Sequence, residues 1–305
     1  MRIGVIGLGL MGEPVAQRLL AAGHEVVVVK RPNSDPVERL VAKGAREASS
    51  LADAAAEIEL VLMLLPTSNE VEVVLFGPDG IVAGMRPGFL AVDMGTCYPL
   101  DTRRIAERFH ALGGHLIDAP VTGGVEGARA GTLTVMAGGD PALIDGIRHV
   151  LSSFSHHVYH FGEIGSGHSA KLIQNMIGWI EVAGIAEGLT LARATGLDLE
   201  TFFKMLTTSH SNSPILQWMT PKVFAGAFDD VEFRLALAHK DIHQATKLAR
   251  ETTRLPLPVS NAATELFQLA CALGFGDQDS TAVIRGLETV IRQTVRAPTA
   301  PRTAS

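Results

Sequence analysis

The hydrophobic pattern divides the chain into two halves of different character. The first half alternates short apolar runs, typical of buried strands, with stretches of helical apolar spacing. The apolar runs lie at Ile3–Ile6, Val26–Val29, Leu60–Leu65, Leu90–Val92, Leu116–Ile117, Thr132–Met136 and Val158–Phe161, and the helical stretches lie near 11–22, 68–76 and 99–112. This alternation predicts an α/β fold in which helices cover a doubly wound parallel sheet.

The second half is expected to be entirely helical. Strand signals stop after Phe161, and from about residue 168 the chain is rich in Ala and Leu at helical spacing. No proline interrupts Ser169–Thr195, and Gly196 is a natural helix terminator. One helix of roughly 27 residues, about 40 Å long at 1.5 Å per residue, is therefore predicted to run through the junction between the halves.

Composition restricts the classes of protein to consider. The 305 residues carry 26 Lys and Arg against 32 Asp and Glu, a net charge of −6, which argues against nucleic acid as a partner. Cys97 and Cys271 are too few for a disulfide framework. Neither a signal-peptide core nor an apolar run of the ~18 residues that a membrane span needs is present. We therefore expect a cytoplasmic protein with no membrane partner.

A glycine motif follows the first predicted strand. Gly7-Leu8-Gly9-Leu10-Met11-Gly12 fits the GxGxxG pattern and opens a helical stretch. At such a position the glycines provide a tight turn, an open approach for a pyrophosphate and close helix–strand packing, while the helix N-terminus offers amide donors to the anion. The first half is therefore predicted to be a Rossmann-type dinucleotide-binding domain, and a merely structural glycine turn is the alternative.

The identity of the cofactor depends on the end of the second predicted strand. An NAD-selective fold usually places Asp or Glu there for the ribose 2′-hydroxyl, whereas this chain has Lys30-Arg31. A guanidinium can form a two-point contact with a 2′-phosphate. The sequence therefore favours NADP over NAD, and two simply solvated side chains are the alternative.

Two further segments carry polar groups suited to a small acid. Thr122-Gly123-Gly124 can present one hydroxyl and two unobstructed N–H groups to a carboxylate, although Gly123-Gly124 alone also fits a plain turn. Lys171 and Asn175 lie four residues apart, on one face near the start of the long helix. A helix N-terminus and partial burial both lower the proton affinity of a lysine, as a general acid requires. A lysine that extends into water is the alternative.

Two other polar clusters carry weaker signals. Lys240-Asp241 by itself is typical of a solvated helix charge pair. His156, His157 and His160 lack Cys or carboxylate companions at ligand spacing, so strand and loop residues are predicted there rather than a metal site. No metal is expected.

These segments together resemble the β-hydroxyacid dehydrogenase family, which includes 3-hydroxyisobutyrate dehydrogenases and semialdehyde reductases. The resemblance covers roughly residues 1–292. It rests on four motifs in order, namely GLGLMG at 7–12, DAPVTGGVEGARAGTLTVMAGG at 118–139, GSGHSAKLIQN at 165–175 and FRLALAHKD at 233–241. The resemblance implies a Rossmann-type domain, an all-helical second domain, and an NADP- or NAD-dependent oxidoreductase acting on a small hydroxy acid or semialdehyde acid.

The resemblance also implies roles for individual residues. Lys171 would be the general acid or base, Asn175 its companion at the substrate, and Thr122-Gly123-Gly124 the carboxylate cradle. Further residues would line the cofactor, namely Leu65, Pro66, Thr96 and Lys240. The cradle commonly begins with Ser, so the extra methyl group of Thr122 is expected to narrow the substrate pocket.

The domain organisation follows from the pattern and the resemblance together. We expect a cofactor domain at 1–163, a substrate and oligomerisation domain at 164–295 and a disordered tail at 296–305, with the boundary in the glycine-bearing segment 162–167. Three glycines of the long helix indicate close helix packing, namely Gly178, Gly184 and Gly188. With the apolar content of the helical half, they predict a homodimer or homotetramer.

Two other functions fit parts of the pattern. An imine reductase has a similar fold but generally lacks a lysine at the position of Lys171. A dinucleotide-binding sensor needs the glycine motif but no proton donor. Lys171 with Asn175 therefore favours a hydroxy-acid dehydrogenase or semialdehyde reductase, and the particular acid stays open.

Overall fold

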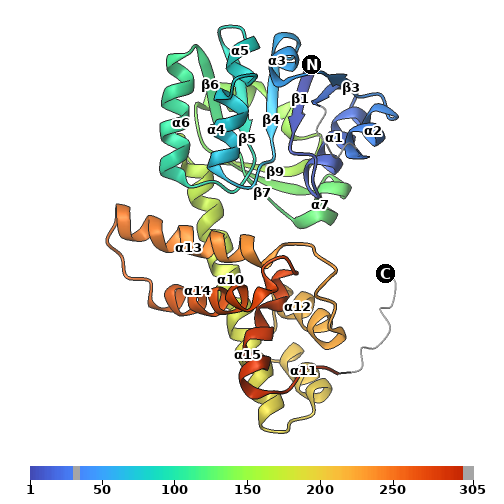
Figure 1. The fold of residues 1–305 in the computed structure, drawn as a ribbon, viewed down its shortest axis with the longest axis vertical. Coiled ribbons are helices and arrows are strands. Elements are labelled where there is room, and N and C mark those ends of the chain that lie inside the picture. The colour runs from blue at the N-terminus through green and yellow to red at the C-terminus, as the bar shows by residue number, and fades with distance from the viewer. Residues whose placement is uncertain (30–34, 298–305) are drawn as a thin grey trace. The chain divides into compact units, whose positions relative to one another are not determined.

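A computed structural model of the chain describes residues 1–29 and 35–297. Its internal contacts divide it into two units, Met1–Lys171 and Leu172–Ser305. One helix, α10 (Ser166–Ala194), belongs to both units, and Figure 1 shows it as a single continuous ribbon. The division therefore falls inside α10, a few residues beyond the glycine-bearing segment 162–167.

The first unit contains a six-stranded sheet whose neighbouring strands all pair in parallel. Its order is β3-β2-β1-β4-β5-β6, so the winding reverses between β1 and β4, as in a doubly wound Rossmann fold. The strands are β1 (Arg2–Ile6), β2 (Glu25–Val29), β3 (Arg46–Ala48), β4 (Leu60–Met63), β5 (Phe89–Asp93) and β6 (Gly114–Asp118). The predicted fold class is confirmed. The hydrophobic pattern does not predict β3, because only one of its three side chains is buried.

Both faces of this sheet are covered by apolar packing. Along β4, Leu60 and Leu62 belong to one buried cluster, whereas Val61 and Met63 belong to another. This alternation explains why the strand is a continuous apolar run. The connecting helices are α1 (Gly12–Ala21), α2 (Asp35–Val41), α3 (Leu51–Glu57), α4 (Ser68–Phe76), α5 (Ile81–Gly84) and α6 (Pro99–Ala111).

A second, mixed sheet follows in the first unit. It is formed by β7 (Val121–Thr122), β8 (Leu133–Ala137) and β9 (Ser155–His160), with β7 antiparallel and β9 parallel to β8. Short helices connect these strands, namely α7 (Gly124–Ala130), α8 (Pro141–Gly146) and α9 (Arg148–Leu151). The sequence pattern predicts β8 and β9 but not the two-residue β7. The three clustered histidines lie on β9, as strand residues.

The second unit is helical, as predicted. Among the described residues, β9 of the first unit is the last strand of the chain. Beyond α10 it contains α11 (Leu199–Thr207), α12 (Pro214–Ala225), α13 (Leu235–Thr252), α14 (Pro258–Ala270), α15 (Ile284–Ile291) and the short turns η1 (Cys271–Phe275) and η2 (Ser280–Val283). Its core includes Phe267, whose ring packs edge-on against the ring of Trp179, with 5.9 Å between the two ring centroids.

The long helix agrees closely with the sequence prediction. It has 29 residues, and the chain leaves it before Gly196, whose φ of 79° is a conformation that favours glycine. Among the described residues no helix is both long and apolar enough to cross a membrane. Most of the predicted tail, residues 298–305, lies outside the described residues, whereas Arg296 within it forms an ion pair with Glu288 at 2.6 Å.

Candidate active site

The glycine motif forms the turn between β1 and α1. Two of its glycines are required by the chain itself: a Cβ atom on Gly7 would lie 2.2 Å from the carbonyl oxygen of Leu64, and one on Gly12 would lie 1.9 Å from the carbonyl oxygen of Gly7. A Cβ on Gly9 would meet no described atom within 4 Å. The open space at Gly9 is therefore available to a ligand, as the approach of a pyrophosphate to this backbone requires.

The predicted cofactor-lining residues of the first unit converge on one edge of the sheet. The motif follows β1, Leu65-Pro66 follows β4 and Thr96 follows β5, so all three loops lie at the carboxyl ends of adjacent parallel strands. The loops also touch, because a Cβ atom on Gly95 would lie 2.1 Å from the carbonyl oxygen of Leu65. This edge includes the reversal between β1 and β4, which is where open α/β sheets bind ligands.

The start of α1 is suited to an anion. No described side chain caps this helix, so its first N–H groups are not occupied by a capping side chain. The acidic residue of its first turn, Glu13, accepts hydrogen bonds from Arg39 at 2.7 Å to each carboxylate oxygen. Those bonds are the main reason that the pKa of Glu13 is lowered. Arg39 therefore balances the carboxylate in the first turn of α1, which would otherwise repel a phosphate.

The residues predicted to distinguish NADP from NAD are Lys30 and Arg31. They lie outside the described residues, immediately after β2 ends at Val29. Their assignment to the 2′-phosphate stays a prediction.

The predicted carboxylate cradle lies where β7 passes into α7. Thr122 ends the strand, and Gly123 and Gly124 have φ angles of 124° and 66°, which favour glycine. A Cβ atom on Gly124 would meet no described atom within 4 Å. The segment is thus the uncapped, open beginning of a helix rather than an isolated turn, which is compatible with a carboxylate at its N–H groups.

Lys171 and Asn175 lie in the first turns of α10, and the helix spacing places them on one side of it. Both side chains are buried, Lys171 being 9% exposed. The structure therefore does not support a lysine that extends into water.

A buried carboxylate in the second unit fixes the orientation of Asn175. The Asn175 Nδ2 group donates a hydrogen bond to Asp241 Oδ2 at 2.7 Å, and Asp241 on α13 is fully buried. The other carboxylate oxygen, Oδ1, lies 3.2 Å from Lys240 Nζ. One carboxylate thus holds both residues that the sequence assigns to this part of the site.

This geometry corrects the expectation of a solvated Lys240–Asp241 pair. Asp241 is completely shielded and the Lys240 side chain is only 19% exposed. The burial of Asp241 could have been predicted from its spacing along α13. Asp241 lies on the buried face of this helix, which also contains Ala238, Ile242 and Ala245. A polar residue on such a face requires a partner.

Comparison with known proteins defines the class first. The family model described as the NAD binding domain of 6-phosphogluconate dehydrogenase matches residues 2–162. The model described as NAD-binding of NADP-dependent 3-hydroxyisobutyrate dehydrogenase matches residues 165–287. The chain is therefore an oxidoreductase with a nicotinamide dinucleotide cofactor. It belongs to the β-hydroxyacid dehydrogenase family.

Three relatives illustrate the family. The chain is 34% identical to 2-(hydroxymethyl)glutarate dehydrogenase of Eubacterium barkeri, over 93% of this chain and 94% of the relative. It is 32% identical to 2-hydroxy-3-oxopropionate reductase of Escherichia coli, over 94% and 97%. The crystal structure of 3-hydroxyisobutyrate dehydrogenase from Salmonella typhimurium superimposes with a TM-score of 0.85 at 29% identity, covering 93% of this chain and 99% of that one.

Imine reductases share the fold at a greater distance. The imine reductase of Bacillus cereus has a TM-score of 0.60 and 23% identity, over 93% of this chain and 98% of that one. At this identity the likeness concerns the fold alone.

Proposed function

We propose that this protein is an NADP(H)-dependent oxidoreductase that interconverts a small 3-hydroxy acid and the corresponding oxo or semialdehyde acid. The observation that carries the proposal is the pair Lys171 and Asn175 on α10, with the Asn175 amide fixed by buried Asp241. In this proposal residues 1–163 bind the cofactor, and residues 164–295 complete the substrate site and the oligomer.

The side chains of the site have distinct roles in this reaction. The cofactor, when bound, supplies or accepts the hydride at the carbonyl carbon. In the reducing direction the Lys171 ammonium donates the proton to the carbonyl oxygen, which gives the hydroxyl group, and in oxidation Lys171 takes that proton back. The Asn175 Nδ2 group donates to Asp241, so the amide oxygen of Asn175, Oδ1, points away from that bond. In this proposal Asn175 Oδ1 accepts a hydrogen bond from the substrate hydroxyl or from the Lys171 ammonium.

Recognition of the acid is assigned to Thr122, Gly123 and Gly124. The open, uncapped start of α7 supports this assignment, since N–H groups there favour a negative charge. Replacing the substrate carboxylate by its amide removes charged hydrogen bonds worth about 1.5–3 kcal/mol each. We therefore expect kcat/KM to fall at least tenfold for the amide, and equal efficiency for acid and amide would contradict the cradle.

A substrate panel tests the reaction itself. Oxidation of NADPH and NADH is followed with succinic semialdehyde, tartronate semialdehyde, methylmalonate semialdehyde, glyoxylate and a cyclic imine. We expect turnover with at least one oxo acid and none with the imine. Turnover of the imine alone would favour an imine reductase, and cofactor binding without any turnover would favour a dinucleotide sensor.

The choice of NADP is tested at Arg31. If its guanidinium holds the 2′-phosphate at two points, Arg31→Ala raises the KM for NADPH by roughly tenfold and leaves that for NADH nearly unchanged. Arg31→Asp adds repulsion and is expected to invert the preference. An unaltered NADPH-to-NADH ratio of kcat/KM in both variants would remove this residue from cofactor selection.

A homodimer or homotetramer is also part of the proposal. By the helical repeat, five residues of α10 lie within about 60° of one another around its axis. They are Ile173, Ile177, Gly184, Gly188 and Leu191. The three apolar side chains are exposed, and a Cβ atom on either glycine would meet no described atom within 4 Å. This face supports packing against a second copy, and light scattering at micromolar concentration that gave a monomer would exclude it.

A further inference from the structure

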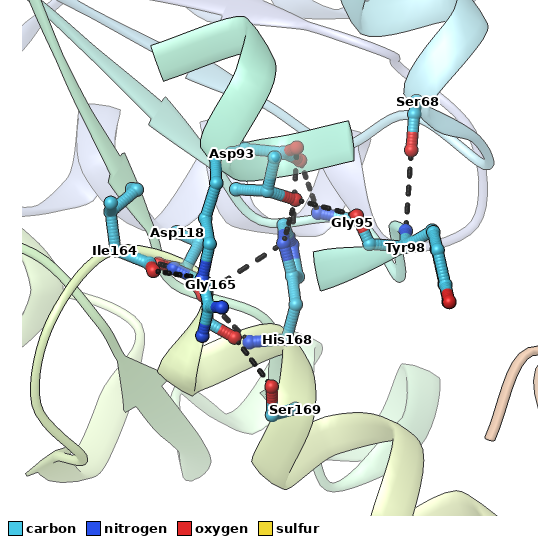
Figure 2. Close-up of polar contacts among 11 residues, drawn as sticks. Ser68, Asp93, Gly95, Tyr98, Asp118, Ile164, Gly165, His168 and Ser169 are labelled. Carbon is cyan, nitrogen blue, oxygen red and sulfur yellow. Dashed lines mark hydrogen bonds and ion pairs between the residues drawn. The ribbon is translucent and has the colours of Figure 1, made fainter. Parts of the chain in front are cut away.

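A buried carboxylate caps the N-terminus of α10 from a distant part of the first unit (Figure 2). Asp118, the last residue of β6, is fully shielded from solvent. Its Oδ1 atom accepts a hydrogen bond from the Gly165 N–H at 2.7 Å, and its Oδ2 atom accepts one from the His168 N–H, also at 2.7 Å. Two backbone donors at the helix start are thus satisfied by one negative charge, which also suits the helix dipole.

The helix start packs closely against the strands that surround this cap. A Cβ atom on Gly167 would lie 2.2 Å from the carbonyl oxygen of Met136, and one on Gly138 would lie 2.6 Å from Asp118 Oδ1. The glycine before His168 is therefore required because α10 begins in direct contact with the ends of β6 and β8.

The His168 side chain is held on one ring nitrogen by a threonine. Its Nδ1 atom lies 2.8 Å from Thr102 Oγ1, and the Thr102 hydroxyl is within donating distance, 3.2 Å, of the Tyr98 carbonyl oxygen. A hydroxyl has one hydrogen to donate. Thr102 therefore links the His168 ring to the backbone at the start of α6, whichever of the two contacts receives its hydrogen.

The other ring nitrogen faces a second buried carboxylate. His168 Nε2 lies 3.9 Å from Asp93 Oδ2, and Asp93 at the end of β5 is almost completely buried. His168 thus lies between two buried carboxylates, because its Nδ1 atom also lies 3.8 Å from Asp118 Oδ2.

We propose that Asp118 and His168 are positioning residues for Lys171, and that together they hold the first turn of α10 in place. Lys171 follows His168 by three residues, less than one helical turn, so any loosening of this turn moves the lysine. The link to Lys171 rests on the proposed function, whereas the anchoring of the helix does not.

The groups packed around His168 come from several elements. Asp93 lies at the end of β5, Asp118 at the end of β6 and Thr102 on α6. The Cys97 thiol, in the loop after β5, hydrogen-bonds to Asp93. Arg103, also on α6, donates from Nε to the carbonyl oxygen of Ile164 at 3.2 Å, just before α10 begins.

Burial raises the pKa of Asp93, and nearby His168 partly opposes this effect. The Asp93 carboxyl therefore holds a proton more tightly than an exposed aspartate does.

A metal ion is the competing explanation for the same side chains. An oxygen of Asp93, the sulfur of Cys97 and a nitrogen of His168 lie within 4.8 Å of one another, and all three residues are buried. Elemental analysis of the purified protein distinguishes the two, because one equivalent of a transition metal per chain would make His168 a metal ligand and overturn its assignment as a positioning residue.

Hydrogen–deuterium exchange of the peptide covering residues 165–171 tests the anchor directly. Asp118→Asn presents an amide hydrogen to one of the two backbone donors, so we expect exchange there to accelerate at least tenfold. Thr102→Val keeps the shape but leaves His168 Nδ1 without its hydrogen-bond partner, so a smaller acceleration of exchange is expected at the same peptide.

Asp140→Ala provides the control. Asp140 caps α8 in the same unit by accepting from the Ala142 N–H at 2.8 Å, so removing its side chain should loosen α8 alone and leave kcat unchanged. In Asp118→Asn and Thr102→Val, kcat should fall more than tenfold while the KM for cofactor changes little. Unchanged exchange at 165–171 in both variants would overturn the anchor, and faster exchange with unchanged kcat would overturn the positioning of Lys171. If the wild type reduces no oxo acid, the proposed function fails, and the exchange result still decides the anchor.

Discussion

Lys171 and Lys222 are both buried lysines, one in each unit, and they differ in what surrounds them. Lys222 on α12 is 2% exposed, and its Nζ atom lies 3.2 Å from Asp279 Oδ2, 3.1 Å from Glu232 Oε1 and 3.0 Å from the Asp230 carbonyl oxygen. Three acceptors thus match the three hydrogens of the ammonium. This lysine is fully committed to its ion pairs.

The main partner of Lys222 is itself part of a structural junction. Asp279 is completely buried and accepts hydrogen bonds from the N–H groups of Glu232 at 3.0 Å, Phe233 at 3.3 Å and Thr281 at 3.1 Å. The Lys222–Asp279 pair therefore connects α12, the segment before α13 and η2. Its role is to hold these elements together.

The described contacts near Lys171 hold the helix that carries it. Asp118 holds the turn of α10 that precedes Lys171, and Asp241 holds Asn175 one turn beyond it. These carboxylates act on the helix backbone and on the neighbouring amide. Burial alone therefore does not distinguish the two lysines, whereas the contacts of the elements that carry them do.

The largest effect is expected for Lys171→Ala. If Lys171 is the proton donor, its removal should lower kcat by a factor of about 10²–10⁴, the usual contribution of a positioned acid or base, with cofactor affinity and melting temperature near those of the wild type. Steady-state kinetics and a thermal melt measure both. Retention of more than about a tenth of the turnover, a loss below ~1.4 kcal/mol, would show that Lys171 is not the proton donor.

The reverse result is expected for Lys222→Met. Removing the ammonium leaves Asp279 as a buried charge without its cation, which should lower the free energy of unfolding by about 3–5 kcal/mol. Turnover per folded molecule should stay unchanged. Denaturant unfolding with kinetics at low temperature checks both, and the double variant Lys222→Met/Asp279→Asn should recover part of the loss. A Lys222→Met protein with wild-type stability and reduced kcat would contradict the structural role of Lys222.

The smallest effect is expected for Glu232→Gln, which removes the exposed partner of the same lysine. The Glu232 side chain is 48% exposed, and ion pairs at such sites contribute about 0–1 kcal/mol. The amide oxygen can still accept from Lys222 or from Trp218 Nε1, which lies 3.0 Å from Glu232 Oε2. The denaturation midpoint should hardly move. A loss of unfolding free energy as large as that of Lys222→Met would show that Glu232, and not Asp279, is the main partner of Lys222.

The residues of the candidate site differ in whether the sequence alone predicts them. Gly7, Gly12 and Lys171 belong to compact local motifs, so their elements and their order were predictable from spacing alone. His168 lies inside one of these motifs, yet its partner Thr102 is 66 residues away. Asp241 is also 66 residues from Asn175, and its neighbour Lys240 suggests a surface pair.

The sequence by itself determined the parallel sheet, the helical second half, the long helix and the glycine turn, because hydrophobic periodicity and glycine conformation act over a few residues. The tertiary structure alone decided which polar residues are buried together. Asp93, Asp118 and His168 meet because the ends of β5 and β6 lie side by side and α10 begins over them. Such partners are selected by the cost of burying a charge without compensation, which depends on the whole fold and leaves no local pattern.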